Sequence, residues 1–443
     1  YKANDVDYGY VLNRTIAANV FSAKKGDPAD LKGLFMQRYL VCESIVNDDD
    51  LLRDLKSTKF DMGIAEIVEA CQEGLFELLG IQNVIHTSAL PIYSHVYKMY
   101  GIPQIPSFMP NIILPFSQFM SIRERFTNFY SLYKLNKLYD KLHDDMTELY
   151  QKKYGADFPH LIDLRKKKAN FVFLNTNEHL DFPNLITTKV KYIGGLENPN
   201  QIPISEKLKN TIEQYKGFVV FSFGSLLKTK QIPPKVKKDI ISAFKRFPDY
   251  AFIWKFDTKD NDNWDFVDGA TNVYFEDWLP QNALVNHPKC KAFISHMGYN
   301  SFLESIMAGV PIIAVPFAYD QGHNAAVVVE KKLGTRVNPV DLNDVTLTKA
   351  LEEVLTDSPS IYHITANKFA NRMKDSMKIM SPRDTILNYV DYAHKHGSLP
   401  DMNLSSNNLN TFQIYLLDIF IPLGLGVILV LVLFLYILRA IFS

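Results

Sequence analysis

The sequence is poor in cysteine and has no excess of charge of either sign. Cys42, Cys71 and Cys290 are the three cysteines among 443 residues, too few and too scattered to predict a disulfide framework or a zinc site. The 48 Lys and Arg residues balance 48 Asp and Glu residues. Because a protein that tracks nucleic-acid phosphates would be strongly basic, the composition argues against nucleic acid as a partner.

Two sequence motifs are also missing. The first residues, YKANDVDYGYVLNRT, include neither an initiator methionine nor the apolar run of a signal peptide. Since a lumenal protein needs a translocation signal, we expect that further residues precede Tyr1. No predicted strand is followed by G-x-G-x-x-G, which argues against a nicotinamide-dependent dehydrogenase.

One long hydrophobic run is present near the carboxyl end. Residues 419–438, IFIPLGLGVILVLVLFLYIL, contain no charged residue, and about twenty apolar residues suffice to cross about 30 Å of hydrocarbon. Asp418 precedes the run and Arg439 follows it, which favours a cytoplasmic position for residues 439–443. We therefore predict a single-pass membrane protein whose bulk lies on the other side.

Strands and helices alternate in two stretches of the chain. In the first, residues 60–65 and 83–90 are predicted strands joined by an amphipathic helix over 66–80, which is a βαβ unit. A proline- and aromatic-rich segment over 100–130 overlaps a predicted helix over 121–152. Further strands are predicted at 169–176, 189–196, 217–226, 251–256, 272–280, 291–296 and 311–317, with a helix at 233–247. This alternation predicts parallel, doubly wound sheets.

A cluster of polar residues joins the strand at 291–296 to the helix that follows it. His296, Gly298, Asn300 and Ser301 lie at the carboxyl end of the strand, where unpaired backbone N–H groups and the helix dipole favour an anion such as a pyrophosphate. Gly298 would let the backbone approach a phosphate, and Asn300 with Ser301 would cap the helix. Glu304, one turn deeper, suits hydrogen bonds from ribose hydroxyls.

Other strands of the second half also end in polar residues. Ligands of open parallel sheets bind outside the carboxyl ends of the strands, so we expect these residues to meet in one site. Trp278 offers a flat face to a base, and Gln281 can donate to and accept from its edge. The remaining strand-end residues are Gly224 and Ser225 after one strand, and Asp320 and Gln321 after another.

The segment that carries these residues resembles the signature of the UDP-glycosyltransferases. It reads WLPQNALVNHPKCKAFISHMGYNSFLESIMAGVPIIAVPFAYDQ over 278–321. The stretches VVFSFGSL, FIWKFD and YIGGL and the hydrophobic tail are also similar, so the resemblance covers most of residues 35–440. Met297 stands where animal members usually have glycine and plant members cysteine, which indicates a permissive position.

The resemblance implies an α/β fold of the GT-B kind: two Rossmann-type parallel-sheet domains facing a cleft, plus one carboxyl-terminal transmembrane helix. The expected parts are an acceptor-binding domain over 1–196, a linker over 197–216, a UDP-sugar-binding domain over 217–385, a return and juxtamembrane segment over 386–418, the transmembrane helix over 419–438 and a short cytoplasmic end over 439–443.

The resemblance also implies roles for the site residues. Trp278 would stack on uracil and Gln281 would bond its edge, while Glu304 would hold the ribose. The diphosphate would lie against His296, Ser225, Gly298, Asn300 and Ser301, and the sugar hydroxyls against Asp320 and Gln321. The UDP-sugar is then a co-substrate, with no cofactor and no metal. Asp260, Asn261 and Asp262 match a metal-binding Asp-x-Asp triplet of other transferases, but their run DTKDNDNWD is typical of a polar loop.

An inverting transferase also needs a base that deprotonates the acceptor hydroxyl. In the family this base is a histidine near the start of the first domain, which would precede Tyr1 here. Glu66 occupies the position of its acid partner, usually an aspartate. His86 and His95 do not match the histidine motif, and we interpret both as packing or loop residues.

Acceptor, sugar and location follow from the resemblance as well. The apolar segment 93–120 would line a cleft for small lipophilic acceptors that carry a hydroxyl. Leu174 precedes Asn175 where vertebrate glucuronate users carry an arginine, so glucuronate and glucose both stay open. The family implies detoxification in the endoplasmic reticulum, contact with membrane lipid and homo- or hetero-oligomers, and Asn13 and Asn403 begin glycosylation triplets. The alternative function is a silent UDP-sugar-binding partner of complete enzymes.

Overall fold

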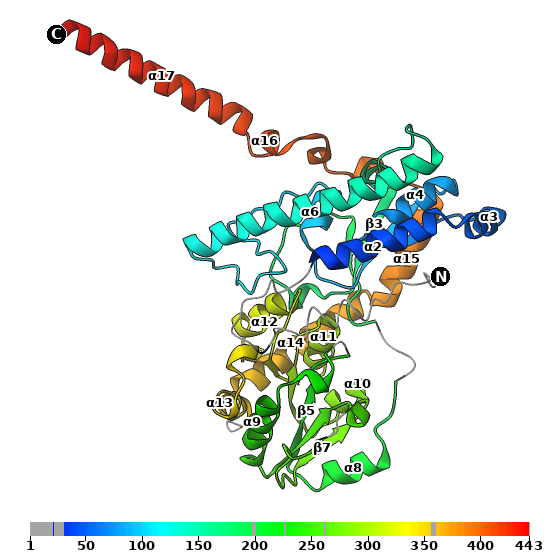
Figure 1. The fold of residues 1–443 in the computed structure, drawn as a ribbon, viewed down its shortest axis with the longest axis vertical. Coiled ribbons are helices and arrows are strands. Elements are labelled where there is room, and N and C mark those ends of the chain that lie inside the picture. The colour runs from blue at the N-terminus through cyan, green and yellow to red at the C-terminus, as the bar shows by residue number, and fades with distance from the viewer. Residues whose placement is uncertain are drawn as a thin grey trace.

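The structure, a computed structural model, describes residues 21, 31–196, 201–225, 227–260, 263–355 and 360–442. Two bodies built on parallel sheets lie one above the other in Figure 1, and a long helix leaves the upper one. Asn13, a predicted glycosylation site, lies outside the described residues, as do Asn261 and Asp262 of the Asp-x-Asp triplet.

The amino-terminal half is built on a four-stranded sheet of order β1-β2-β3-β4, in which every neighbouring pair is parallel. Its described elements are α2 (Leu31–Val46), α3 (Asp49–Ser57), β1 (Gly63–Glu66), α4 (Cys71–Leu78), β2 (Val84–Ser88), α5 (Ser94–Met99), α6 (Ile122–Tyr154), α7 (Leu161–Lys168), β3 (Ala169–Leu174), η1 (Glu178–Leu180) and β4 (Val190–Tyr192).

The predicted helix over 66–80 begins only at Cys71. The Glu66 side chain accepts a hydrogen bond of 2.8 Å from the Val68 backbone N–H, so the chain turns after β1 before the helix can start. The long predicted helix over 121–152 is confirmed as α6, and Ser121 with Glu124 forms a capping box at its start.

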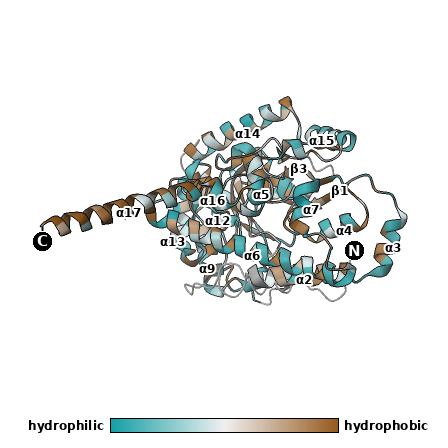
Figure 2. Cartoon of the chain, turned by 90° about the horizontal axis from the view of Figure 1, so that it is seen from above, coloured by the Kyte–Doolittle hydropathy of each residue, from teal (hydrophilic) through white to brown (hydrophobic). Residues whose placement is uncertain are grey.

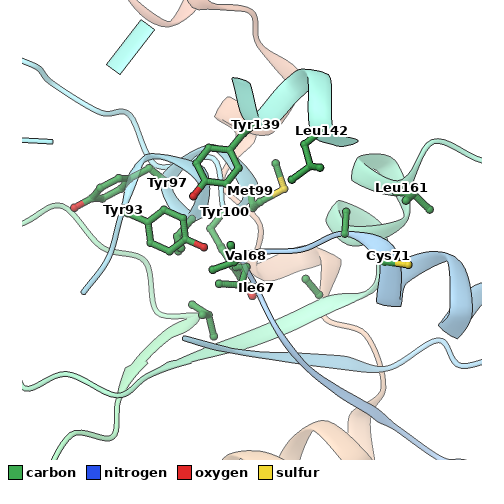
Figure 3. Close-up of a cluster of buried hydrophobic side chains, with 14 of the residues drawn as sticks. Ile67, Val68, Cys71, Tyr93, Tyr97, Met99, Tyr100, Tyr139, Leu142 and Leu161 are labelled. Carbon is green, nitrogen blue, oxygen red and sulfur yellow. The ribbon is translucent and has the colours of Figure 1, made fainter. Parts of the chain in front are cut away.

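The amino-terminal core lies between the sheet and helices α2, α4, α5, α6 and α7. Figure 3 shows Tyr139 and Leu142 of α6 above Tyr93, Tyr97 and Tyr100, with Cys71 at the edge of the cluster. Cys42 and Cys71 form a disulfide with a Cα–Cα distance of 5.6 Å. The cysteine count gave no reason to expect this bond, because the two positions meet only when α2 packs beside α4.

The carboxyl-terminal half is built on a six-stranded parallel sheet of order β10-β9-β8-β5-β6-β7. Its described elements are α8 (Glu206–Glu213), β5 (Gly217–Ser222), η2 (Thr229–Gln231), α9 (Pro234–Lys245), β6 (Tyr250–Lys255), η3 (Thr258–Asp260), β7 (Val273–Glu276), α10 (Gln281–Val285), β8 (Cys290–Ser295), α11 (Tyr299–Met307), β9 (Ile312–Ala314), α12 (Gln321–Glu330), β10 (Gly334–Arg336), η4 (Pro339–Asp341) and α13 (Asp344–Leu355).

Strand β10 and helices α8, α10, α12 and α13 are missing from the sequence prediction. Strand β10 is only three residues long and extends one edge of the sheet. Helix α8 lies within residues 197–216, predicted as a linker, and its Leu208 and Ile212 are buried in the same cluster as Phe218 of β5. This part of the connection therefore belongs to the packed carboxyl-terminal half.

The end of the chain returns to the amino-terminal half before it leaves the body. It forms α14 (Ile361–Ile379), α15 (Pro382–His396), η5 (Pro400–Met402), η6 (Ser405–Asn408), α16 (Thr411–Ile414) and α17 (Leu417–Phe442). The Ala393 carbonyl of α15 accepts a hydrogen bond of 2.6 Å from Asn83 Nδ2, and Ala393 packs with Phe171 of β3.

Helix α17 projects away from both bodies (Figure 1) and is apolar on all sides (Figure 2). Its 26 residues make it long and apolar enough to cross a membrane, and none of them is buried against the protein. A helix that is hydrophobic all round and unpacked suits a lipid environment.

Candidate donor-binding site

A cavity of about 510 Å³ lies at the carboxyl edge of the six-stranded sheet. The order of strands reverses direction between β5 and β8, and such a switch point is where open parallel sheets bind ligands. Eight of the ten predicted donor-binding residues line the cavity: Ser225, Trp278, Gln281, His296, Gly298, Asn300, Ser301 and Glu304.

His296 follows β8 and is held between two glycines. A Cβ atom on Gly224 would lie 2.7 Å from the imidazole, and one on Gly298 would lie 2.6 Å from its Nε2. We expected Gly298 to make room for a phosphate; its geometry makes room for the His296 ring. The Nδ1 atom is buried without a hydrogen-bond partner. Burial lowers the pKa of His296 to about 4, so the ring is neutral near pH 7.

Met297 has a left-handed backbone, with φ of 72°. This conformation costs a non-glycine residue about 1–2 kcal/mol. The surroundings fix it, because Asn324 Nδ2 donates to the Met297 carbonyl at 2.9 Å and the side chain is fully buried. In this chain the position is therefore constrained by its backbone conformation and its buried side chain.

Helix α11 begins without a side-chain cap. Its N-cap residue is Gly298, and no side-chain cap accepts a hydrogen bond from the backbone N–H groups of its first turn, so the prediction that Asn300 and Ser301 cap this helix was wrong. The first backbone N–H groups of a helix have no partner inside it. An uncapped start beside a cavity leaves those donors, and the positive end of the helix dipole, to an anionic ligand.

Trp278, Gln281 and Glu304 form one side of the cavity. Trp278 lies between β7 and α10 and is 63% exposed, unusual for a large aromatic side chain. Gln281 Nε2 donates to Glu304 Oε2 at 2.8 Å and to Ser301 Oγ at 3.2 Å, which fixes α10 against α11. Partial burial raises the pKa of Glu304, and the hydrogen bond from Gln281 opposes this shift.

Asp320 and Gln321 do not line the cavity with the other predicted residues. Gln321 Oε1 accepts hydrogen bonds from the backbone N–H groups of Phe317 and Ala318, at 2.8 and 3.1 Å. Asp320 Oδ2 accepts one of 2.7 Å from Asn324 Nδ2, and burial raises the pKa of Asp320. Both side chains hold the loop after β9 in place.

Glu66 lies at the carboxyl end of β1, in the amino-terminal half, and burial raises its pKa. Among the described residues, no histidine hydrogen-bonds its carboxylate. His86 and His95 are fully buried. His86 Nε2 lies 2.8 Å from Glu73 Oε1, and His95 Nε2 lies 3.0 Å from Arg165 Nη1, so both belong to the packed interior.

The two halves meet at the start of α11. Asn175, directly after β3, donates from Nδ2 to Asn300 Oδ1 at 2.9 Å. The Asn177 backbone N–H donates to the Tyr299 hydroxyl at 3.0 Å. His323 Nε2 of α12 lies 2.8 Å from Asp181 Oδ1. These contacts place residues of the first half beside the cavity of the second.

The structure adds lining residues that the sequence did not single out. Lys255, at the end of β6, brings a positive charge to the cavity, with its Nζ 3.3 Å from Asp257 Oδ1. Gln201 and Ile202 reach it from the connection between the halves. Lys255 could have been predicted from the sequence, because it stands at the carboxyl end of a strand like the other residues of the site. Gln201 and Ile202 could not, because they follow no strand end of the second half.

In the part of the chain that the structure describes, no group of three or more His, Cys, Asp or Glu residues could hold a metal ion.

Two parallel-sheet halves with a cavity at the switch point of the second define the GT-B class of glycosyltransferases. Solved structures agree with this fold. The glycotransferase of kitacinnamycin matches with a TM-score of 0.60 at 15% identity, over 84% of this chain and 86% of that one. A UDP-glucose:anthocyanidin 3-O-glucosyltransferase, solved in complex with UDP, matches with a TM-score of 0.58 at 15% identity, over 85% of each chain.

The sequence comparisons narrow the class to a family. The family described as "UDP-glucoronosyl and UDP-glucosyl transferase" matches residues 11–442. The nematode protein ugt-47 of Caenorhabditis elegans, named as a UDP-glucuronosyltransferase, is 30% identical over 86% of this chain and 71% of its own length. UDP-glucuronosyltransferase 2B1 of Rattus norvegicus is 27% identical, over 86% and 70%. The chain therefore belongs to the UDP-glycosyltransferase family, and its activity is transfer of a sugar from a UDP-sugar.

Proposed function

We propose that this protein transfers glucose or glucuronate, with inversion and without a metal ion, from a UDP-sugar to a hydroxyl of small lipophilic acceptors. The observation that carries the proposal is the cavity at the β5–β8 switch point. It gathers a base-stacking surface, an uncapped helix start and a neutral histidine in about 510 Å³, and ligand pockets of ordinary size are about 300–1,000 Å³.

The nucleoside would lie against α10. Trp278 would stack on uracil with its exposed ring, and Gln281 would bond the edge of the base. Glu304 would accept hydrogen bonds from the ribose, and its contact with Gln281 (2.8 Å) supports this arrangement, because it holds the two side chains side by side.

The diphosphate would lie at the start of α11. His296 would donate from a ring nitrogen, with Ser225, Gly298, Asn300 and Ser301 supplying backbone or side-chain donors. As the bond to the sugar breaks, negative charge grows on the leaving UDP, and the helix dipole contributes up to about 2 kcal/mol at such a position. Lys255, paired with Asp257, adds an ammonium group from the end of β6. These groups support departure of UDP without a metal ion.

The sugar and acceptor groups would face the amino-terminal half. We assign the sugar hydroxyls to Asp320 and Gln321 at the start of α12, outside the lining of the donor cavity. Glu66 would orient the base that removes the proton of the acceptor hydroxyl as it attacks the anomeric carbon. We assign the lipophilic acceptor to the apolar segment 93–120, of which Tyr93, Tyr97 and Tyr100 pack in the core and Phe108 is exposed.

We place the bulk of the chain in the lumen of the endoplasmic reticulum, anchored by α17, with detoxification of lipophilic compounds as its role. The disulfide between Cys42 and Cys71 supports an oxidising compartment. Asn403 begins a glycosylation triplet on the same side of the anchor, and its Oδ1 accepts a hydrogen bond of 2.7 Å from Lys189. Homo- or hetero-oligomers with other transferases belong to the same proposal.

The test is transfer by the full-length protein in lipid nanodiscs, with UDP-glucose and UDP-glucuronate as competing donors. Trp278→Ala should weaken UDP binding by about 1–3 kcal/mol, or roughly 5- to 150-fold, because one base–aromatic stack is lost. Isothermal titration calorimetry with UDP measures this change.

Trp264→Ala is the matched control, because Trp264 is also partly exposed but lies outside the cavity; it should keep the affinity for UDP. Equal losses in both variants would contradict the assigned pocket. UDP binding without transfer of either sugar would instead favour the alternative, a silent UDP-sugar-binding partner.

A further inference from the structure

The first half of helix α6 has an exposed apolar stripe. Ile122 is 78% exposed and Phe126 70% exposed, and Phe119, just before the helix, is 81% exposed. The stripe, called here the outer stripe, consists of Phe119, Ile122, Phe126, Phe129, Tyr130 and Tyr133. Residues three or four apart share one face of a helix, so within α6 these side chains form a continuous surface.

This stripe is additional to the core face of the same helix. Leu132 and Leu135 of α6 are buried at 4% exposure each, and Leu135 belongs to the amino-terminal core. A surface helix of a soluble protein has one apolar face, with polar residues opposite. An outer face of three phenylalanines, an isoleucine and two tyrosines, exposed to water, calls for a covering partner.

The charges beside the stripe are mostly positive. Residues 119–137 contain four cations and one anion: Arg123, Arg125, Lys134 and Lys137 against Glu124. Lys134 Nζ lies 4.7 Å from the centre of the Tyr130 ring. The second half of the helix is instead slightly acidic, with Asp140, Asp144, Asp145 and Glu148 against Lys141, Lys152 and Lys153. Apolar side chains flanked by cations suit a membrane interface, where the cations can meet the phosphates of lipid headgroups.

The membrane anchor is tied to the loop on which this half of α6 rests. The Tyr415 hydroxyl, just before α17, donates to the Gln104 carbonyl at 2.6 Å, and Ser406 Oγ donates to the Gly101 carbonyl. Asn128 of α6 closes the other end of this loop, because its Nδ2 donates to the carbonyls of Pro106 and Met109 at 2.8 and 2.9 Å.

These hydrogen bonds connect the segment before the anchor, through the loop 101–109, to the first half of α6. In Figure 1, the free end of α6 and helix α17 extend toward the same side of the amino-terminal half. A membrane crossed by α17 would run close to the start of α6.

We propose that the outer stripe of α6 lies in the interfacial layer of the membrane that α17 crosses, with the flanking cations against anionic headgroups. The body of the enzyme would then rest on the bilayer at two points, and the loop 101–120 between them would border the lipid. With this second contact, the two halves have a fixed orientation relative to the membrane. With α17 as the single contact, they would be free to rotate relative to it.

The test places a fluorescent NBD label on the stripe of the full-length protein, through Phe126→Cys in a Cys290→Ser background that keeps the disulfide. The protein is reconstituted, one copy per disc, in nanodiscs of phosphatidylcholine and phosphatidylserine that contain lipid with a nitroxide on its acyl chain. We expect a blue-shifted emission that the nitroxide quenches. Phe129→Cys repeats the measurement at a second position in case the first substitution disturbs folding.

Lys152→Cys is the matched control, because Lys152 is exposed on the second half of the same helix; its label should keep the emission of a probe in water and resist quenching. Arg123→Glu combined with Arg125→Glu should reduce the quenching at position 126. Labels at positions 126 and 129 that the nitroxide does not quench would overturn the proposal. So would a blue shift that appears only in discs with two copies, since a second copy of the chain would then cover the stripe.

Discussion

A buried network of the amino-terminal half and a histidine of the carboxyl-terminal half use their polar side chains in opposite ways. In the amino-terminal half, Glu73, His86 and Arg165 are all fully buried and bond one another: Glu73 Oε1 lies 2.9 Å from Arg165 Nε and 2.8 Å from His86 Nε2. In the carboxyl-terminal half, His296 lies beside a cavity with Nδ1 unpaired. Paired groups hold elements together, and groups left without partners beside a cavity are available to a ligand.

The network of the first half connects three elements of its core. Glu73 belongs to α4, His86 to β2 and Arg165 to α7. Arg165 Nη1 also donates to the Ile67 carbonyl at 2.9 Å. Burial alone would raise the pKa of Glu73, but its contacts with His86 and Arg165 hold this pKa at about 2. The carboxylate is therefore charged at any physiological pH.

The largest effect should follow from breaking this network. Glu73→Gln leaves the Arg165 cation buried without its anion, and removing one partner of a buried ion pair costs about 3–5 kcal/mol. The thermal unfolding of the amino-terminal half in detergent should shift to lower temperature, while the pocket of the other half should bind UDP as before at temperatures below the transition.

Glu206→Gln is the control, because Glu206 forms an exposed pair with Lys209 and exposed pairs contribute little. The folded-state pKa of Glu73 is depressed, so its stabilisation is present above pH 4.5 and is lost as the pH falls toward 2. If Glu73→Gln unfolded like the wild type, the network would not hold this half together.

A smaller effect should come from His296. Its pKa is about 4 in the folded protein against 6.5 unperturbed. Between these two pH values the unfolded chain binds a proton at this histidine and the folded chain does not. The free energy of unfolding therefore falls as the pH drops from 6.5 to 4. One such group accounts for about 1–3 kcal/mol, allowing for its partial exposure.

His296→Asn should remove the contribution of this histidine to the pH dependence of the free energy of unfolding. The variant should therefore lose less stability than the wild type between pH 6.5 and 4. Thermal unfolding at a series of pH values measures the difference. His394→Asn, on exposed α15, should behave as the wild type. Identical pH profiles for wild type and His296→Asn would mean that the His296 ring is solvated, and the contrast between the halves would weaken.

The sequence predicts most of the binding-site residues of the second half, because their positions in the fold follow from their positions next to predicted strands. Each polar residue after a strand is placed by that strand, and a parallel sheet brings the strand ends to one edge. Eight predicted residues therefore meet at the cavity. The prediction that Asn300 and Ser301 cap α11 was wrong because it rested on the general preference for polar residues at the start of a helix. That preference does not identify a helix whose first backbone N–H groups have no side-chain partner.

The first half was harder to predict because its important contacts join distant residues. The Cys42–Cys71 disulfide spans 29 positions, and Arg165 reaches Glu73 across 92. Gln321 shows a related limit in the second half: its position after a strand was foreseen, but not that its side chain would bond the backbone of its own loop. A pattern along the chain places a residue near an edge, and tertiary packing decides which way its side chain turns.

The smallest effect should come from the contact that joins the halves. Asn175 Nδ2 donates to Asn300 Oδ1 at 2.9 Å, which leaves the Asn300 amide N–H₂ as the group that can donate to the diphosphate. Asn175→Ala removes one hydrogen bond worth about 0.5–1.5 kcal/mol, so calorimetry should show UDP binding about two- to tenfold weaker. Asn338→Ala, an exposed asparagine far from the cavity along the chain, should change nothing. Asn175→Ala could instead lower the unfolding temperature and leave the affinity for UDP unchanged. In that case Asn175 would only stabilise the contact between the two halves, and it would not contribute to binding of the donor.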